Sequence, residues 1–361
     1  MPTSYDLRQL QQMPLEHKII LTRARIREWI DGNDGQVYVA FSGGKDSRVL
    51  LDLVRGGGYP DAPAVFCNTG LEYPEVRQFA LSFDNVTEVR PTWGRAGKSR
   101  GKAADDIITF RDVLYYYGYP LISKQVADNI ASARSNYGGS RWKRLHGESK
   151  RLDSGKKSQF DTSTYLPLYD LPVKISPYCC KVNKKSPMHK YQVRTGRKAM
   201  VATMAEESLL RRQAWLKSGC NAFDGDPPVS KPMSFWLEQD VLGYIQHKGL
   251  LIPSVYGEIE QTEEGLHCTG CQRTGCVFCP FGCHLEKGET RFQRLKKTHP
   301  KLYEHCMGGG AYEPNPDYDE AAPDWKWNPK EIWVPTKSGL GFAKVFDMVN
   351  EIYGKDFIRY E

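Results

Sequence analysis

The sequence predicts an α/β fold: a parallel sheet with helices on both faces, plus a cysteine-rich C-terminal lobe. Three observations lead to this prediction. Strand and helix patterns alternate over residues 15–91, a glycine-rich turn joins the first strand to the next helix, and most cysteines follow later in the chain. Strands separated by helices of this length form parallel sheets, and their ligands bind at the carboxyl ends of the strands.

Hydrophobic periodicity locates the elements of this alternating region. Apolar residues recur at helical spacing in three segments, and short apolar runs typical of buried strands lie between them. Helices are therefore expected at 15–30, 46–54 and 74–82, and strands at 36–41, 62–68 and 86–91.

Length and composition limit the classes of protein to consider. The chain has 361 residues, a formal net charge of +7 and 10 cysteines. Its first residues lack the apolar run of a signal peptide, and no run is long enough to cross a bilayer. We therefore expect a cytoplasmic protein whose cysteines serve metal or redox chemistry rather than a disulfide scaffold. The modest positive charge suits phosphorylated substrates and permits nucleic acid.

The turn after the first strand has the composition of a phosphate-binding loop. It reads Ser-Gly-Gly-Lys-Asp-Ser over Ser42–Ser47. Gly43 and Gly44 let the backbone approach an anion closely, the two serines add hydroxyl donors, and Lys45 adds a positive charge. Asp46 can cap the helix or help to hold a metal bound to the phosphates. The spacing differs from Walker A and from the dinucleotide G-x-G-x-x-G motif.

This hexapeptide resembles the PP-loop, SGGxDS, of the ATP pyrophosphatases (adenine nucleotide α-hydrolases). Two further segments resemble the PAPS reductase branch of that superfamily. Residues 67–75 (CNTGLEYPE) resemble its DTGxxxPET element, and 202–212 (ATMAEESLLRR) resemble its G-x-R-x-x-E-S-x-x-R segment. Taken alone, Asn-Thr-Gly is also a common turn with a helix cap. The resemblance implies a Rossmann-like (HUP/PP-loop) sheet that binds an adenine nucleotide.

The resemblance also implies which residues form the site. Those expected to bind the nucleotide are Ser42, Gly43, Gly44, Ser47, Asn68, Thr69, Gly70, Glu207 and Ser208. Those expected to be catalytic are Lys45, Asp46 and Arg211. Lys45 and Arg211 would neutralise charge that develops on phosphate. The sequence departs from the family pattern at several positions, and Met204 stands where the family has an arginine.

A third segment, 231–245 (KPMSFWLEQDVLGYI), follows the family's P-x-x-x-W-x-x-x-D-V-x-x-Y-I block. We expect Trp236, Val241 and Ile245 to start a helix and to pack in the core rather than to form a site. The expected domains are an N-terminal helical segment over 1–35, a nucleotide-binding PAPS reductase-like domain over 36–260, and a cysteine-rich segment with an irregular C-terminal lobe over 261–361.

Two clusters of cysteines indicate a metal centre. Cys179 and Cys180 are adjacent, and the second cluster reads Cys268-x2-Cys271-x4-Cys276-x2-Cys279-x3-Cys283. Thiolates this close together repel one another or oxidise unless a metal neutralises them. The spacing leaves zinc, an iron–sulfur cluster and two separate centres open.

Residues 178–188 (YCCKVNKKSPM) resemble the C-C-x-x-R-K-x-x-P-L element of the iron–sulfur adenylylsulfate reductases. In that group a vicinal cysteine pair and a later C-x2-C bind a 4Fe–4S cluster next to the nucleotide. The ligands that this resemblance implies are Cys179, Cys180, Cys276 and Cys279, with Cys268, Cys271 and Cys283 as surplus thiols.

The loop and the chain end favour an ATP-dependent function. The Lys and Asp of SGGKDS are typical of ATP users in this superfamily. Reductases of the family use a cysteine in a C-terminal tail, and here no cysteine follows Cys306. We expect MgATP to be cleaved between its α- and β-phosphates as an acceptor oxygen is adenylated. Sulfur delivered at the cluster or a nearby thiol then displaces AMP, as in ATP-dependent thiolation enzymes. A tRNA, DNA or small molecule would be the acceptor, and a sulfur-donor protein is a candidate partner.

Two alternatives stay open. The first is a phosphoadenylylsulfate or adenylylsulfate reductase, which reduces the sulfonucleotide to sulfite with Cys283 or Cys306 as nucleophile. The second is a nucleic-acid-binding zinc protein, because residues 133–157 are rich in Lys and Arg with Tyr137 and Trp142 between them. A solvated surface loop explains that segment equally well.

Overall fold

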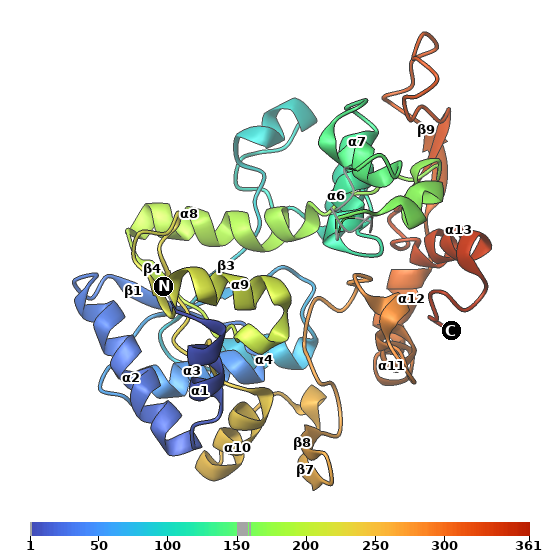
Figure 1. Ribbon diagram of the computed structural model, residues 1–361. Coiled ribbons are helices and arrows are strands. Elements are labelled where there is room, and N and C mark those ends of the chain that lie inside the picture. Colours follow the sequence, from blue (N-terminus) through green and yellow to red (C-terminus); the bar gives the residue numbers. More distant parts are fainter. Residues whose placement is uncertain (1, 150–157, 159) are drawn as a thin grey trace. The chain divides into compact units, whose positions relative to one another are not determined.

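A computed structural model describes residues 2–149, 158 and 160–361 (Figure 1). The chain forms two compact units, each built from two stretches of sequence. Unit 1 comprises Met1–Arg90 with Ser186–Cys276, and unit 2 comprises Pro91–Lys185 with Val277–Glu361. The domains expected at 1–35, 36–260 and 261–361 are continuous in sequence and remain a prediction. Within the part of the chain described, no helix has the length and apolar character needed to span a membrane.

Unit 1 contains the expected alternating region. Its helices are α1 (Ser4–Gln11), α2 (Leu15–Asp31), α3 (Lys45–Arg55), α4 (Pro74–Leu81), α8 (Ser186–Thr195), α9 (Leu209–Ser218) and α10 (Glu238–Lys248). Its strands are β1 (Val37–Ala40), β2 (Ala64–Cys67), β3 (Val86–Val89), β4 (Lys198–Met200), β5 (Asn221–Ala222), β6 (Val229–Ser230), β7 (Ile259–Thr262) and β8 (Gly265–Cys268). All six elements predicted from periodicity are present, with ends that differ by one or two residues.

A six-stranded sheet forms the centre of unit 1, in the order β3-β2-β1-β4-β6-β5. β1 pairs in parallel with β2 on one side, through Val39 opposite Ala64, and with β4 on the other, through Val37 opposite Lys198. Only β5 runs antiparallel to its neighbour. The strand order therefore changes direction at β1, which is where open α/β sheets bind their ligands. The predicted fold class is confirmed.

The alternation of side chains along β1 explains why helices cover both faces of the sheet. Val37 and Val39 point into a core shared with α2, α3 and α10, whereas Tyr38 points to the other face. There its ring lies 5.1 Å from that of Tyr191 on α8, measured between centroids. Figure 1 shows α8 on one side of β1 and β4, with α2 and α3 on the other. Trp236 on the segment before α10 is fully buried, as its sequence block predicts.

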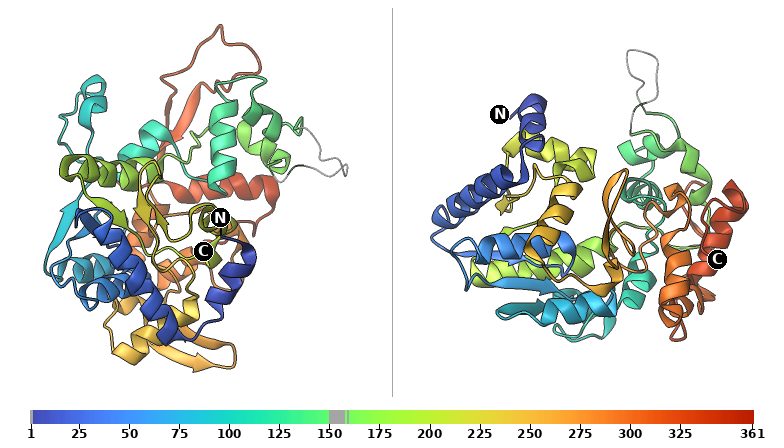
Figure 2. Two further views of the ribbon diagram at one scale, coloured as in Figure 1. Left: turned by 60° about the vertical axis from the view of Figure 1, so that its left-hand side comes forward. Right: turned by 90° about the horizontal axis from the view of Figure 1, so that it is seen from below.

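An antiparallel hairpin carries the start of the cysteine-rich segment. β7 pairs with β8 through Ile259 opposite Cys268, and the hairpin packs against α10 (Figures 1 and 2). Gln239 of α10 fixes this contact, because its amide accepts from the N–H of Leu266 and donates to the carbonyl of the same residue. The hairpin thus leads the chain from α10 directly to Cys268.

Unit 2 is mainly helical. Its α-helices are α5 (Phe110–Tyr117), α6 (Lys124–Ala133), α7 (Ser140–Leu145), α11 (Arg291–Thr298), α12 (Pro300–Met307) and α13 (Phe342–Tyr353), and its paired strands are β9 (Ala311–Pro314) and β10 (Glu331–Val334). Phe342 at the start of α13 packs against aromatic rings of other segments, with Tyr119 at 5.0 Å and Phe110 at 6.3 Å between centroids. Of the basic segment 133–157, residues 150–157 lie outside the described residues.

Candidate functional site

Three predicted segments of unit 1 follow three neighbouring strands. Residues Ser42–Ser47 follow β1, Asn68–Gly70 follow β2, and the segment containing Glu207 follows β4. Because these strands are adjacent and parallel, their carboxyl ends lie at the same edge of the sheet. The topology therefore brings together segments that are far apart in the sequence.

The Ser42–Ser47 loop is held in shape by its own polar groups. Gly43 has a φ of +76°, and a β-carbon placed there would lie 2.8 Å from the carbonyl oxygen of Val76. The Ser47 hydroxyl donates to the Gly44 carbonyl at 2.9 Å and lies 3.0 Å from the Ser42 hydroxyl. The loop therefore requires glycine at position 43 both for backbone conformation and for close packing against α4.

The Gly43→Ala variant should weaken nucleotide binding roughly tenfold and destabilise the fold by about 1–3 kcal/mol, because the methyl group adds backbone strain and a clash with α4. Gly35→Ala is the matched control. Gly35 also has a positive φ of +70°, but a β-carbon there meets nothing within 4 Å. Nucleotide titration and urea unfolding check both variants, and equal loss of binding in Gly35→Ala would contradict this role for Gly43.

Lys45 is a buried cation at the start of α3. Its side-chain nitrogen donates to the carbonyl of Gln272 at 2.7 Å, and it pairs with Glu238 at 3.0 Å and with Asp46 at 3.8 Å. Burial disfavours the charge, but the two carboxylates outweigh it and raise the pKa of Lys45. Burial also raises the pKa of Asp46 despite the attraction of Lys45. The loop therefore keeps a fixed positive charge where a phosphate would bind.

Hydrogen bonds within the chain fix the conformation of the segment after β2. Thr69 donates from its backbone and its hydroxyl to the Glu72 carboxylate, at 3.0 and 2.7 Å. The Asn68 side chain accepts from the Gly70 N–H at 3.0 Å and donates to Glu88 on β3. These bonds fit the turn that Asn-Thr-Gly sequences commonly form, and Gly70 stays exposed at the strand end.

The segment after β4 is dominated by an ion-pair network. Glu207 pairs with Arg211, and its other carboxylate oxygen lies 3.3 Å from the guanidinium of Arg273. The Ser208 hydroxyl caps α9 by accepting from the Arg211 N–H at 3.3 Å. Ser208 therefore shapes the helix start, while Arg211 and Arg273 leave positive charge at this edge.

Five residues that the sequence did not single out contact the predicted site. Three of them lie on or above the phosphate loop: Tyr256 accepts from the Lys45 backbone N–H at 3.1 Å, Thr274 lies 2.7 Å from the Tyr256 hydroxyl, and Gln272 accepts from the Lys45 ammonium. The other two are Glu238 and Arg273. Sequence patterns predict no role at the site for any of these residues, because each reaches it through tertiary packing.

Comparison with known proteins supports the assignment of the Ser42–Ser47 segment. Residues 36–103 match the sequence profile of the phosphoadenosine phosphosulfate reductase domain. This part of the chain is therefore similar to the phosphoadenosine phosphosulfate reductase domain. The matched region contains β1, Ser42–Ser47 and Asn68–Gly70, and it ends before the cysteine clusters. The iron–sulfur branch of the family stays a prediction.

One solved structure similar to the chain is the crystal structure of phosphoadenylyl-sulfate reductase from Candida auris in a phosphate complex. The sequences are 12% identical, the match covers 76% of this chain and 98% of that chain, and the TM-score is 0.34. No protein with a curated function is significantly similar in sequence.

The expected cluster ligands lie outside residues 36–103, which match the phosphoadenosine phosphosulfate reductase domain. Within unit 2, the pKa of Cys180 is lowered to about 5, chiefly because of a hydrogen bond with Cys179, with Lys124 and Lys184 adding to the effect. Burial raises the pKa of Cys279. Among the described residues, no group of three or more Cys, His, Asp or Glu side chains converges to hold a metal. The cluster stays a prediction, and no reaction step below depends on it.

The two cysteines considered as reductase nucleophiles are poorly suited to that role. Cys306 is fully buried and Cys283 nearly so. Burial raises the pKa of Cys283 to about 12 and raises that of Cys306 well above its usual range. A thiol that stays protonated and buried is a weak nucleophile.

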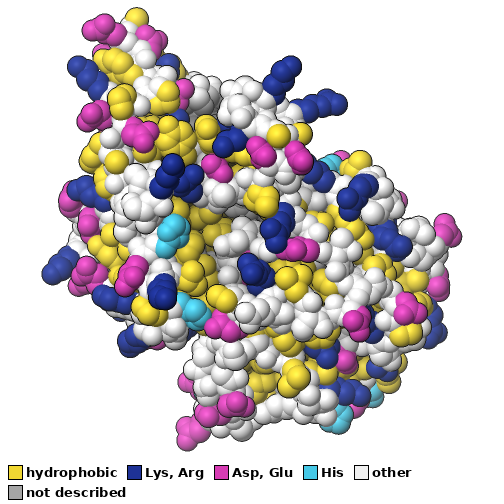
Figure 3. Space-filling model, turned by 180° about the vertical axis from the view of Figure 1, so that it is seen from behind, with side chains coloured by type: hydrophobic (Ala, Val, Ile, Leu, Met, Phe, Trp, Pro, Cys, Tyr) yellow, Lys and Arg dark blue, Asp and Glu magenta, His cyan; other side chains and the backbone are white. Residues whose placement is uncertain are grey.

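In the described part of the basic segment 133–157, fewer side chains are available to bind nucleic acid than the composition predicts. Trp142 is buried and stacks on His146 with 3.7 Å between ring centroids, so it cannot also stack on a base. Tyr137 is 61% exposed, whereas Arg141 is paired with Asp128. On the face drawn in Figure 3, Lys and Arg side chains are interspersed with Asp and Glu. That face shows no continuous basic surface.

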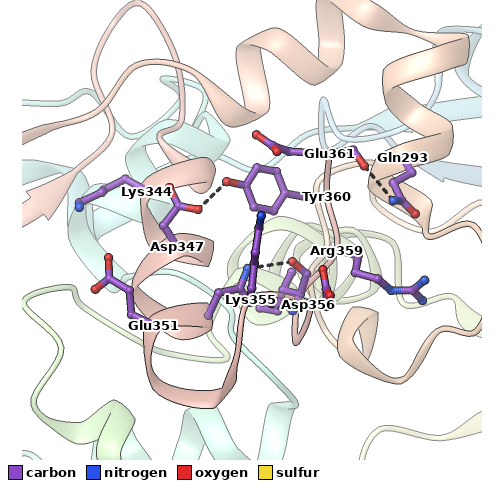
Figure 4. Close-up of a pocket in the computed structure, with 11 residues that line it drawn as sticks. Gln293, Lys344, Asp347, Glu351, Lys355, Asp356, Arg359, Tyr360 and Glu361 are labelled. Carbon is purple, nitrogen blue, oxygen red and sulfur yellow. Dashed lines mark hydrogen bonds between the residues drawn. The ribbon is translucent and has the colours of Figure 1, made fainter.

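A cavity of about 470 Å³ lies in unit 2, away from every predicted site residue. Figure 4 shows Lys344, Asp347 and Glu351 lining it from α13, with the Tyr360 hydroxyl donating to Asp347. Gln293 donates to the backbone carbonyl of Glu361 at 2.8 Å. Cationic and anionic side chains alternate around this cavity, so its charge selects neither anions nor cations.

Proposed function

We propose that the chain is an enzyme that acts on a sulfonucleotide, adenylylsulfate or its 3′-phosphorylated form, bound at the Ser42–Ser47 loop. The observation that carries this proposal is that the loop lies inside the phosphoadenosine phosphosulfate reductase domain, at the strand-order switch beside β1. Backbone N–H groups at a helix start, together with the buried Lys45, suit the 5′-phosphate of such a nucleotide.

The reaction would be reductive release of sulfite. Two electrons must reach the sulfur as its bond to the phosphate oxygen breaks and the nucleotide leaves with that oxygen. Thiols supply two electrons when they form a disulfide. Since Cys283 and Cys306 are buried with raised pKa values, we propose that an external dithiol acts as the reductant.

A second candidate function is ATP-dependent sulfur transfer, the first expectation from the sequence. One observation favours it: Asp46 follows Lys45 at the loop, and the two side chains pair at 3.8 Å. A carboxylate beside the phosphates suits Mg²⁺, which prefers oxygen ligands and binds together with substrate phosphates. In this function ATP is cleaved between its α- and β-phosphates, and a tRNA, DNA or small molecule accepts sulfur. Asp46 would then help to hold Mg²⁺, and Arg211 would share with Lys45 the stabilisation of negative charge on the phosphates.

The experiment uses full-length protein purified without oxygen. One portion receives sulfur-labelled adenylylsulfate or phosphoadenylylsulfate with a dithiol, and labelled sulfite is measured. Another receives labelled ATP, and pyrophosphate is measured with and without bulk tRNA. Sulfite formation that Gly43→Ala lowers and Gly35→Ala retains supports the reductase. Pyrophosphate without sulfite overturns the reductase in favour of sulfur transfer, and neither product overturns both.

The cluster is a separate proposal. We propose that Cys179, Cys180, Cys276 and Cys279 bind a 4Fe–4S cluster, supported by the resemblance of residues 178–188 to the iron–sulfur adenylylsulfate reductases and by the lowered pKa of Cys180. Such a cluster supplies one-electron redox chemistry or a site for sulfur. Iron analysis and broad visible absorbance test it, with Cys180→Ser expected to lose both and Cys220→Ser to keep them. Stoichiometric zinc without iron would overturn the cluster.

A further inference from the structure

A segment of unit 1 already occupies the groups with which the phosphate loop would bind an anion. The Lys45 N–H donates to the Tyr256 hydroxyl at 3.1 Å, and the Lys45 ammonium donates to the Gln272 carbonyl at 2.7 Å. Thr274 lies 2.7 Å from the same tyrosine hydroxyl. Neutral protein oxygens therefore stand where phosphate oxygens would accept these bonds.

The same oxygens close the space above the loop. A β-carbon placed on Gly44 would lie 3.0 Å from the Tyr256 hydroxyl and 3.1 Å from the Thr274 hydroxyl. Gly44 is itself buried, although glycine at this position would let a ligand approach the backbone. A phosphate group is far larger than a methyl group, so it cannot lie on this side of Gly44 while both hydroxyls stay in place.

Tyr256 is joined to the cysteine-rich segment by the backbone. The N–H of Gly270 donates to the Tyr256 carbonyl at 2.8 Å, and the N–H of Cys271 donates to the Val255 carbonyl at 2.8 Å. We call Tyr256 together with residues 268–274 the strap. Because these bonds link its two parts, a displacement of Tyr256 also displaces Cys271.

Cys271 belongs to the strap, and its buried thiol can report the position of the strap. Its side chain is 7% exposed, and its sulfur lies 3.8 Å from the Tyr73 hydroxyl. Tyr73 immediately precedes α4 and follows the Asn68–Gly70 segment at the same sheet edge. This thiol of the strap therefore contacts the segment that leads from Asn68–Gly70 to α4.

We propose that the strap is an internal competitor of the nucleotide: it occupies the phosphate loop in the free protein, and binding of the nucleotide phosphate displaces it and exposes Cys271. This proposal rests on the proposed binding of an adenine nucleotide at the loop. The free energy used to displace the strap lowers the apparent affinity, since only the open fraction of molecules binds.

The first test compares affinities by calorimetric titration of full-length protein with adenylylsulfate and with ATP. Tyr256→Phe and Thr274→Val each remove a hydroxyl from the strap, so each should bind roughly 3- to 10-fold more tightly than the unaltered chain. Tyr244→Phe is the control, because its hydroxyl donates to Asp52 in the same unit, away from the loop. If the hydroxyls were instead ligands of the nucleotide, the two strap variants would bind more weakly.

The second test measures alkylation of Cys271 by iodoacetamide, read by peptide mass spectrometry. Labelling should rise severalfold at saturating nucleotide, while the half-buried Cys220 stays unchanged. Tyr256→Phe should raise Cys271 labelling even without nucleotide. Weaker or unchanged binding by Tyr256→Phe overturns the competitor, and nucleotide-independent labelling of Cys271 overturns its link to the strap. Absence of any nucleotide binding by the unaltered chain is a different result, because it overturns the proposed function itself.

Discussion

Lys45→Met is expected to weaken adenine-nucleotide binding by about 10- to 100-fold, because a charge-assisted bond to phosphate is worth roughly 1.5–3 kcal/mol. The substitution keeps much of the length of the side chain but removes the cation that pairs with Glu238 and Asp46. It also leaves the Glu238 carboxylate without this counter-charge, so some stability is lost as well. Calorimetric titration and urea unfolding separate the two effects.

Lys18→Met is a closely matched control. Lys18 is another buried lysine of unit 1, which pairs with Asp240 and donates to a backbone carbonyl, that of Gln11, at 2.7 Å. Its partner Asp240 and the Lys45 partner Glu238 both lie in the first turn of α10. Both variants should therefore lose comparable stability, but only Lys45→Met should lose affinity. Equal loss of affinity in Lys18→Met would show that the effect of Lys45 is structural.

Arg134→Leu is expected to destabilise unit 2 by roughly 3–5 kcal/mol, because it leaves several buried carbonyl groups without a donor. The Arg134 guanidinium donates to the carbonyl of Val173 at 2.7 Å, to that of Tyr169 at 2.6 and 2.9 Å, and to those of Leu168 and Leu171. It also lies 4.1 Å from the ring centroid of Trp327. One side chain thus joins the end of α6 to residues 168–173 and to Trp327 of the same unit.

Native-state hydrogen exchange of peptides from residues 163–174 measures this effect locally, which is preferable because a chain with two units need not unfold in one step. Arg141→Leu in the same unit is the control. Arg141 is exposed and pairs with Asp128 at the surface, so its loss should cost about 1 kcal/mol or less. Unchanged exchange in Arg134→Leu would refute the role assigned to this guanidinium.

The sequence predicted those features that depend on residues close together in the chain. The strands and helices of residues 15–91 follow hydrophobic periodicity, and the Ser42–Ser47 loop follows from glycine and serine chemistry at a strand end. Each of these features depends on neighbours within a few residues, so a single sequence is sufficient to find it.

The site residues that the sequence did not predict reach the site through contacts between segments that are far apart in the chain. The Tyr256 hydroxyl accepts a hydrogen bond from the backbone N–H of Lys45, 211 residues away. The Gln272 carbonyl accepts one from the Lys45 ammonium, 227 residues away. Neither residue type has a spacing that would mark it. Glu207 and Ser208 were predicted to bind nucleotide, and the structure shows the carboxylate of Glu207 paired with two arginines and Ser208 capping α9. Their contact with a nucleotide stays a prediction.

Hydrogen–deuterium exchange of the full-length chain, with and without saturating adenylylsulfate, tests the central claim most directly. Peptides that contain Ser42–Ser47 and Asn68–Gly70 should exchange more slowly when the nucleotide is present, while those of residues 268–274 should exchange faster as the strap leaves the loop. If adenylylsulfate and ATP both leave the exchange of Ser42–Ser47 unchanged, the assignment of this loop as the nucleotide site is contradicted.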